Sequence, residues 1–299
     1  MQLIKHFMAN DASRSALNAL TRATFGFSFE SWYAAGWWAG DYLPYAFEED
    51  GRLLSNVSVN RMHFLLDGQE RHFIQLGTVM TDPACRHQGL ASRLMRAAMD
   101  DFAGQCDGFY LFGDFGDLGA LGFYDQLGFS RICETRYTLR ARAQESLLRG
   151  PAREGGFAPV DPADAGMKAR YVELVRSGAP YAALEHLNRL SLTMFYTASM
   201  KRVLYAPALD CFAVLERDGD NLCLQSVACA RRLPLETVLA YLPPFTGTLT
   251  LGFAPCGGDE ALFDAQAFDG GDDYRLFILG DALREIEARR LCFPALSHA

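Results

Sequence analysis

Apolar and polar residues alternate at the start of the chain in a pattern that predicts a short strand and two helices. Residues 3–8 predict the strand. The helix that follows has Asp11 or Ser13 as its expected N-terminal cap. Residues 28–38 predict a second helix, rich in tryptophan, whose aromatic side chains either belong to the core, which we favour, or line a ligand pocket.

Three apolar segments then predict an antiparallel meander. They cover residues 42–47, 53–64 and 72–80, and the acidic and glycine residues at 49–51 and 67–68 favour tight hairpin turns between them. The pattern continues with a helix at 89–102, a buried strand at 109–112, a helix at 118–127 and a strand at 130–139.

The sequence changes in character between residues 141 and 166, where Ala, Arg, Gly and Pro replace the periodic pattern. Such a stretch is typical of a linker. Because 299 residues exceed the usual size of one hydrophobic core, we predict two domains, 1–142 and 163–299, joined by a linker at 143–162.

The second half repeats the order of elements predicted for the first half, with helices followed by strands around one further helix. The predicted helices are 163–177, 181–197 and 235–241, and the predicted strands include 211–216, 222–228, 248–253 and 274–279. This order indicates a duplicated fold, although no sequence repeat is visible.

Composition narrows the classes of function. The net charge is −8 and no basic stripe is present, which argues against a nucleic-acid partner. None of the eight cysteines forms a Cys-x-x-Cys pair or has a histidine at metal-ligand spacing, so we expect buried thiols and no metal. Without a signal peptide or a long apolar run, we expect a cytoplasmic protein with no membrane partner.

One segment carries candidate chemistry. After the strand ending near Thr81, Pro83 is followed by Arg86-x-x-Gly89-x-Ala91, and a helix begins directly after the glycine. A tight loop before a helix directs backbone N–H groups, with the positive end of the helix dipole behind them, at one point. The segment therefore predicts an anion site suited to a pyrophosphate. It lacks the lysine of a P-loop and the flanking glycines of a dinucleotide-binding loop, which argues against ATP or NAD.

This loop resembles the Arg/Gln-x-x-Gly-x-Gly/Ala loop of the Gcn5-related N-acetyltransferase (GNAT) superfamily. About 35 residues downstream, Gly122-Phe-Tyr124-Asp-Gln-Leu-Gly128-Phe129 resembles the signature that ends the acetyl-CoA-binding half of the same superfamily. The resemblance implies an α/β fold with a mixed, mostly antiparallel sheet flanked by helices. It also implies an N-acetyltransferase that moves an acetyl group from acetyl-CoA to a primary amine of a small molecule, a peptide or a protein.

The resemblance also implies roles for individual residues. Tyr124 would protonate the departing CoA thiolate, and the backbone of three strand residues would pair with the pantetheine arm of acetyl-CoA. The loop would hold the pyrophosphate. The strand residues are Val79, Met80 and Thr81, and the loop residues are Arg86, His87, Gln88, Gly89, Leu90, Ala91 and Ser92.

The general base is not singled out by any motif. The candidates are His72, Gln75, Glu30, Glu48 and Glu49, or a chain of water molecules. A non-catalytic CoA-binding sensor is the alternative function, although a phenol at the sulfur favours catalysis.

The two-unit organisation resembles the enhanced intracellular survival group of acetyltransferases. The second half lacks the Arg-x-x-Gly-x-Ala loop, so we expect it to be a degenerate GNAT-like domain. In that group the chain terminus can enter the active site, which predicts that the Ala299 carboxylate reaches toward Tyr124.

Overall fold

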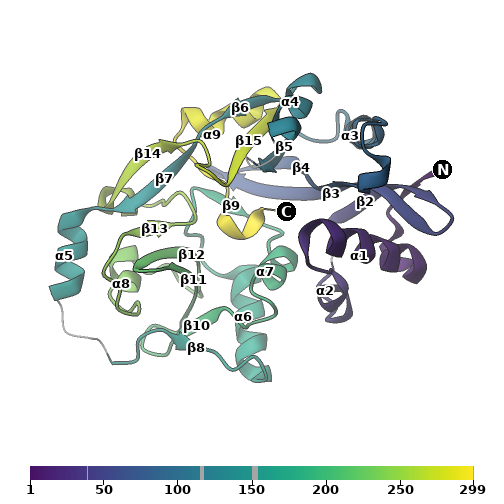
Figure 1. The fold of residues 1–299 in the computed structure, drawn as a ribbon. Helices are drawn as coiled ribbons and strands as arrows, with labels where there is room; N and C mark the ends of the chain where they lie inside the picture. The colour runs from purple at the N-terminus through teal and green to yellow at the C-terminus, as the bar shows by residue number, and fades with distance from the viewer. Residues whose placement is uncertain (39, 115–117, 150–153, 299) are drawn as a thin grey trace.

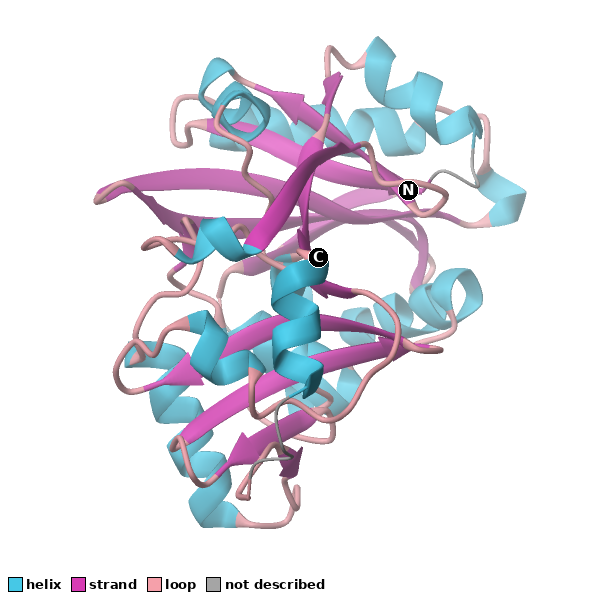
Figure 2. Cartoon of the chain, turned by 90° about the vertical axis from the view of Figure 1, so that its left-hand side faces the viewer, coloured by secondary structure: helices cyan, strands magenta, loops and turns pink. Residues whose placement is uncertain are grey.

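The computed structural model describes residues 1–38, 40–114, 118–149 and 154–298. It contains an eight-stranded and a seven-stranded sheet. Figures 1 and 2 show the first sheet in the upper part of the molecule and the second below it. Most strand pairs in both sheets are antiparallel, and helices flank the sheets, which confirms the predicted fold class.

The first sheet has the order β1-β2-β3-β4-β5-β15-β6, and β9 pairs with β3. Its strands are β1 (Gln2–Lys5), β2 (Tyr42–Glu49), β3 (Arg52–Leu66), β4 (Gln69–Thr81), β5 (Gly108–Asp114), β6 (Ser130–Ile132), β9 (Leu184–His186) and β15 (Tyr274–Leu279). The helices of this half are α1 (Asp11–Phe25), α2 (Glu30–Ala34), α3 (Leu90–Phe102) and α4 (Leu118–Gln126).

These helices cover opposite faces of the first sheet because the strand residues alternate between two apolar clusters. Leu17 of α1 and Trp32 of α2 share a cluster with Met80 of β4. Leu94 of α3 instead packs with Leu76 of the same strand. The face with α1 and α2 is called the α1 face below, and the other is called the α3 face.

The second sheet has the order β14-β7-β13-β12-β11-β10-β8. Its strands are β7 (Glu134–Leu139), β8 (Ala158–Pro159), β10 (Val203–Ala206), β11 (Cys211–Asp218), β12 (Asn221–Cys229), β13 (Leu249–Leu251) and β14 (Phe263–Phe268). The remaining helices are α5 (Ala141–Arg149), α6 (Ala165–Ser177), α7 (Leu190–Tyr196), α8 (Leu235–Leu239) and α9 (Glu285–Ala288).

The two halves of the chain exchange strands: the second half supplies β9 and β15 to the first sheet, and the first half supplies β7 to the second sheet. In the first sheet, β4 and β5 run parallel and β15 from the end of the chain lies between β5 and β6. In the second sheet, β12 and β13 run parallel and β7 from the first half lies between β13 and β14. The division at residues 142 and 163 stays a prediction, and the two sheets do not follow it strand by strand.

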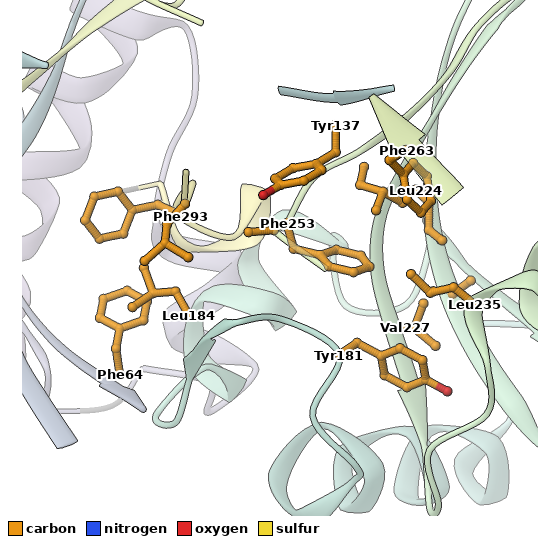
Figure 3. Close-up of a cluster of buried hydrophobic side chains, with 14 of the residues drawn as sticks. Phe64, Tyr137, Tyr181, Leu184, Leu224, Val227, Leu235, Phe253, Phe263 and Phe293 are labelled. Atoms are coloured by element: carbon orange, nitrogen blue, oxygen red, sulfur yellow. The ribbon is translucent and has the colours of Figure 1, made fainter. Parts of the chain in front are cut away.

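A continuous apolar core fills the space between the two sheets. Phe64 of β3 and Leu184 of β9 lie beside Phe293, and Leu224 of β12 and Leu235 of α8 lie on the other side of the cluster (Figure 3). The core therefore joins the sheets through the C-terminal segment that carries Phe293.

Several sequence predictions need correction. The cap of α1 is Asn10, whose side chain accepts the Ser13 N–H at 3.0 Å, and not Asp11 or Ser13. The helix α5 overlaps the start of the linker predicted at 143–162, and the linker itself stays a prediction. The helix predicted at 181–197 is the strand β9 followed by the shorter helix α7, because β9 pairs with the end of β3.

The expectation of free thiols is wrong for two of the eight cysteines. The register of β11 and β12 places Cys211 directly opposite Cys229, with their Cα atoms 4.8 Å apart, and the two are disulfide-bonded. A pairing between two separate strands leaves no spacing signal in the sequence, so the Cys-x-x-Cys search could not find it.

Candidate active site

The candidate site begins where β4 and β5 separate. These parallel strands pair only from Phe73 with Gly108 to Gln75 with Tyr110. Beyond that point β4 continues to Thr81 and β5 to Asp114, while β4 stays paired with β3 on its other side. The two strands therefore border an opening in the middle of the sheet.

A bulge in β4 lies at this opening. Between Asn56 and Ser58 the β3–β4 register shifts, so that Val57 faces both Thr78 and Val79. Thr78 has a φ of +46°, which is unfavourable for a β-branched residue. Such a bulge bends its strand and re-aims side chains, and here it lies in the stretch of β4 that is no longer paired with β5.

The loop predicted to bind pyrophosphate lies directly after β4. Asp82 fixes its start, since its carboxylate accepts the Ala84 N–H at 3.0 Å. His87 (φ +61°) and Gly89 (φ +71°) then turn the chain into α3, with Gly89 as the cap. The side chains from Arg86 to Gln88 are exposed, and Leu90 is buried and anchors the helix.

The remaining predicted cofactor residues follow this geometry. Val79 contacts the apolar cluster of the α3 face, whereas Met80 is buried on the α1 face. The Thr81 hydroxyl lies 2.9 Å from the Ser55 hydroxyl. Ala91 and Ser92 occupy the first turn of α3 and are half-buried. The structure thus brings the strand and loop residues together at one end of the β4–β5 opening.

Tyr124 is buried on the α3 face, next to β5. Its ring centroid lies 5.1 Å from that of Phe277 on β15, and its carbonyl accepts the N–H groups of Leu127 and Phe129 where α4 ends. A Cβ atom placed on Gly113 of β5 would lie 3.1 Å from the Tyr124 ring. Gly113 therefore lets this ring pack directly against the strand that borders the opening.

The C-terminal segment reaches β5 from the other face. The Phe293 ring stacks on Tyr110 with centroids 4.1 Å apart, and the His298 ring stacks on Phe112 at 3.9 Å. Burial lowers the pKa of His298 to about 4, so this imidazole is neutral at neutral pH. The predicted approach of Ala299 to Tyr124 lies outside the described residues.

Of the candidates for the general base, the structure places only Gln75 at the opening. Gln75 is fully buried in the last β4–β5 pair. Glu30 instead binds Arg14 and Asn18, and Glu49 pairs with the N-terminal ammonium. His72 lies against His63 near the start of β4. Glu48 lies at the β2 end of the first hairpin.

Sequence reasoning missed a polar row on the α1 face. In-register partners place Tyr42 of β2, Asn60 of β3, Gln75 of β4 and Tyr110 of β5 side by side across four strands. All four are at most 5% exposed. The row ends at the last pair before β4 and β5 separate, so it borders the opening.

The tryptophans of the predicted aromatic helix lie at this face. Trp32 is buried, and Trp38 packs on Tyr42 with ring centroids 4.7 Å apart. Trp37 and Trp38 also line a pocket of about 400 Å³ between the end of α2 and the start of α7. The cluster is therefore partly core and partly pocket wall.

Comparison with known proteins identifies the first half. Residues 14–129 match the model of the acetyltransferase (GNAT) family. This part of the chain is similar to the GNAT family. The match supports the acyltransferase class that the sequence resemblance implied. A search of curated proteins gives no match.

Solved structures resemble the chain over both halves. A GCN5-related N-acetyltransferase from Kribbella flavida has a TM-score of 0.55 at 16% identity, covering 93% of this chain and 71% of that chain. A probable N-acyltransferase from Enterococcus faecalis V583 has a TM-score of 0.54 at 15% identity, and the match covers 93% of this chain and 72% of that chain. Eis1 from Mycobacterium abscessus has a TM-score of 0.50 at 14% identity, and the match covers 91% of this chain and 73% of that chain. These likenesses support the tandem arrangement of the GNAT fold.

Proposed function

We propose that this GNAT domain transfers an acetyl group from acetyl-CoA to a primary amine. The observation that carries the proposal is the β4–β5 opening, which leads from the bulge at Thr78 to the loop at the start of α3. The backbone of Val79, Met80 and Thr81 would hold the pantetheine arm as an added strand. The amides of residues 86–92 would hold the pyrophosphate.

The reaction is a direct displacement. The amine nitrogen attacks the thioester carbonyl, the new C–N bond forms, the C–S bond breaks, and the Tyr124 hydroxyl protonates the departing thiolate. The amine proton leaves through a base or water. A role for the Ala299 carboxylate in this step stays a prediction.

The acceptor is proposed to be a small molecule or a peptide amine, with no nucleic acid or membrane as partner. No helix in the described part of the chain is long and apolar enough to cross a bilayer.

The deciding experiment is calorimetric titration of acetyl-CoA into the wild type and Gly89→Glu. The substitution places a negative side chain at the loop, so we expect affinity to fall at least tenfold, about 1.4 kcal/mol. Gly68→Glu is a matched control. Like Gly89, whose φ is +71°, Gly68 has a positive φ (+76°) and open space around it. Gly68 lies in the β3–β4 hairpin and not in the proposed pyrophosphate loop.

Release of CoA thiol is then measured with a panel of primary amines. Binding with turnover supports an acetyltransferase, and binding without turnover would favour a CoA-binding sensor. If the wild type does not bind acetyl-CoA, or if both substitutions weaken binding equally, the proposed cofactor site is wrong.

A further inference from the structure

The polar row on the α1 face is unusual for the centre of a sheet. The row consists of Tyr42, Asn60, Gln75 and Tyr110. The next row on the same face is apolar, with Met62 of β3 paired with Phe73 of β4. Burying amides and hydroxyls costs free energy unless each finds a hydrogen-bond partner. The row therefore needs an explanation beyond folding.

Part of the row is satisfied within the protein. The Tyr42 hydroxyl accepts a hydrogen bond from Ser58 at 2.6 Å and lies 3.0 Å from the Thr78 hydroxyl of the bulge. The Tyr110 hydroxyl donates to the Gln75 side chain at 3.4 Å. These contacts tie the two ends of the row to β3 and β4 and fix its geometry.

Asn60, in the middle of the row, is not fully satisfied. Asn60 is 2% exposed, and its Nδ2 atom has no hydrogen-bond partner among the described residues. The same holds for Oδ1 of Asn56, one row beyond Ser58 on the same strand. The buried, unused amide donor of Asn60 lies one strand away from the β4–β5 opening, next to Gln75, and a ligand carbonyl would complete it.

The row is uncharged, and nearby carboxyls are engaged elsewhere. Glu134 and Glu185 are the only buried carboxyls among the described residues. Glu134 accepts hydrogen bonds from Tyr274 and from the Phe293 N–H, and Glu185 pairs with Arg189. An acceptor with a positive charge in addition to its reacting amine would bury that charge here without a free buried carboxylate to pair with it. Burying an unpaired charge costs free energy.

We propose that this row binds the acceptor, and that it selects a primary amine whose neighbouring group is an uncharged amide. The inference rests on the proposed function. The acceptor's carbonyl takes the Asn60 N–H, and its amine projects into the β4–β5 opening. Trp38 packs on Tyr42 at one end of the row and also lines the pocket of about 400 Å³, so this pocket adjoins that end of the row.

Asn60→Leu tests the inference without endangering the fold. Leucine has nearly the shape of asparagine and removes an unpaired buried donor, so the melting temperature should hold or rise. Tyr171→Phe is the matched control. The Tyr171 hydroxyl is also buried without a partner, but it lies in a separate apolar cluster of the second half.

CoA release is measured with glycinamide, with a tetra-alanine peptide bearing a free N-terminus, and with spermidine. We expect kcat/KM to be at least tenfold higher for the amide-bearing amines than for spermidine. In Asn60→Leu, kcat/KM for those amines should fall at least tenfold, mainly because KM rises, while the affinity for acetyl-CoA stays unchanged. Tyr171→Phe should have the kcat/KM of the wild type. Preference between glycinamide and the peptide distinguishes a small acceptor from a peptide terminus.

Two results would overturn the inference while leaving the proposed function in place. One is a preference for spermidine, or no turnover of any amide-bearing amine by protein that binds acetyl-CoA. The other is an Asn60→Leu enzyme with wild-type kcat/KM. Failure of acetyl-CoA to bind the wild type would instead remove the proposed function itself.

Discussion

At the scale of single residues, the position of Tyr124 depends on a glycine opposite its ring. A Cβ on Gly113 would lie 3.1 Å from both Tyr124 and Phe277, which is closer than ordinary contact. Gly113→Ala should therefore displace the phenol, lower kcat about tenfold and reduce the free energy of unfolding by about 1–3 kcal/mol. Acetyl-CoA affinity should change little, because the pyrophosphate loop is untouched.

Steady-state kinetics and urea unfolding check this prediction. Gly122→Ala is the control, since a Cβ at this position of α4 meets no atom within 4 Å. Equal kcat values for Gly113→Ala and wild type would show that the exact placement of Tyr124 does not limit turnover.

The sequence allows predictions for residues whose proposed role depends on local chain geometry. Gly89 and Tyr124 stand in short motifs in which loop, cap and helix follow one another along the chain. The polar row could not be found in this way, because Tyr42 and Asn60 meet only through the register of a hairpin. A one-residue change of register would move Asn60 to the other face.

At the scale of elements, the pattern of apolar residues predicted most strands but not the sheet to which each belongs. Residues 130–139 were predicted as one strand. They form β6 in the first sheet and β7 in the second, with Cys133 between them. The sheet to which a strand belongs is decided by pairing partners far along the chain. Here β15, near the C-terminus, pairs with β5.

The strand exchange predicts that the first half cannot fold by itself. A fragment of residues 1–142 lacks β15, which pairs with both β5 and β6 and contributes the fully buried Phe277 next to Tyr124. We expect the fragment to expose unpaired strand edges and to aggregate or show no cooperative unfolding.

Circular dichroism during thermal unfolding, with calorimetry for acetyl-CoA, compares the fragment with the full chain. A fragment that unfolds cooperatively and binds acetyl-CoA with full-length affinity would show that β15 is dispensable, and would support a division of the chain at residue 142.

At the scale of the whole molecule, Glu134 joins both sheets to the C-terminal segment. It belongs to β7 of the second sheet, accepts the Tyr274 hydroxyl of β15 at 2.7 Å, and accepts the Phe293 N–H at 2.8 Å. Burial raises the pKa of Glu134 from its usual 4.5 to about 7. The folded protein therefore holds this proton over a pH range in which the unfolded chain has lost it.

The sign of the pH effect follows from this difference. Stability from the protonated Glu134 is fully present below about pH 4.5 and is lost progressively as the pH rises to about 7. Glu134→Gln keeps an acceptor oxygen but cannot ionise. The unfolding free energy of the wild type should thus fall relative to Glu134→Gln by up to about 3 kcal/mol across this window, and the difference should be constant above it.

Urea unfolding of both proteins at several pH values measures that difference directly. Glu260→Gln, at an exposed carboxyl, is carried through the same series as the control. A difference that does not change between about pH 4.5 and about pH 7 would mean that Glu134 ionises as readily in the folded protein as in the unfolded chain. The folded protein would then hold a buried carboxylate at Glu134, stabilised by hydrogen bonds from the Tyr274 hydroxyl and the Phe293 N–H. Hydrogen bonds to a charged carboxylate are stronger than those to a neutral carboxyl, so these two bonds would link the two sheets more strongly than bonds to a protonated Glu134 would.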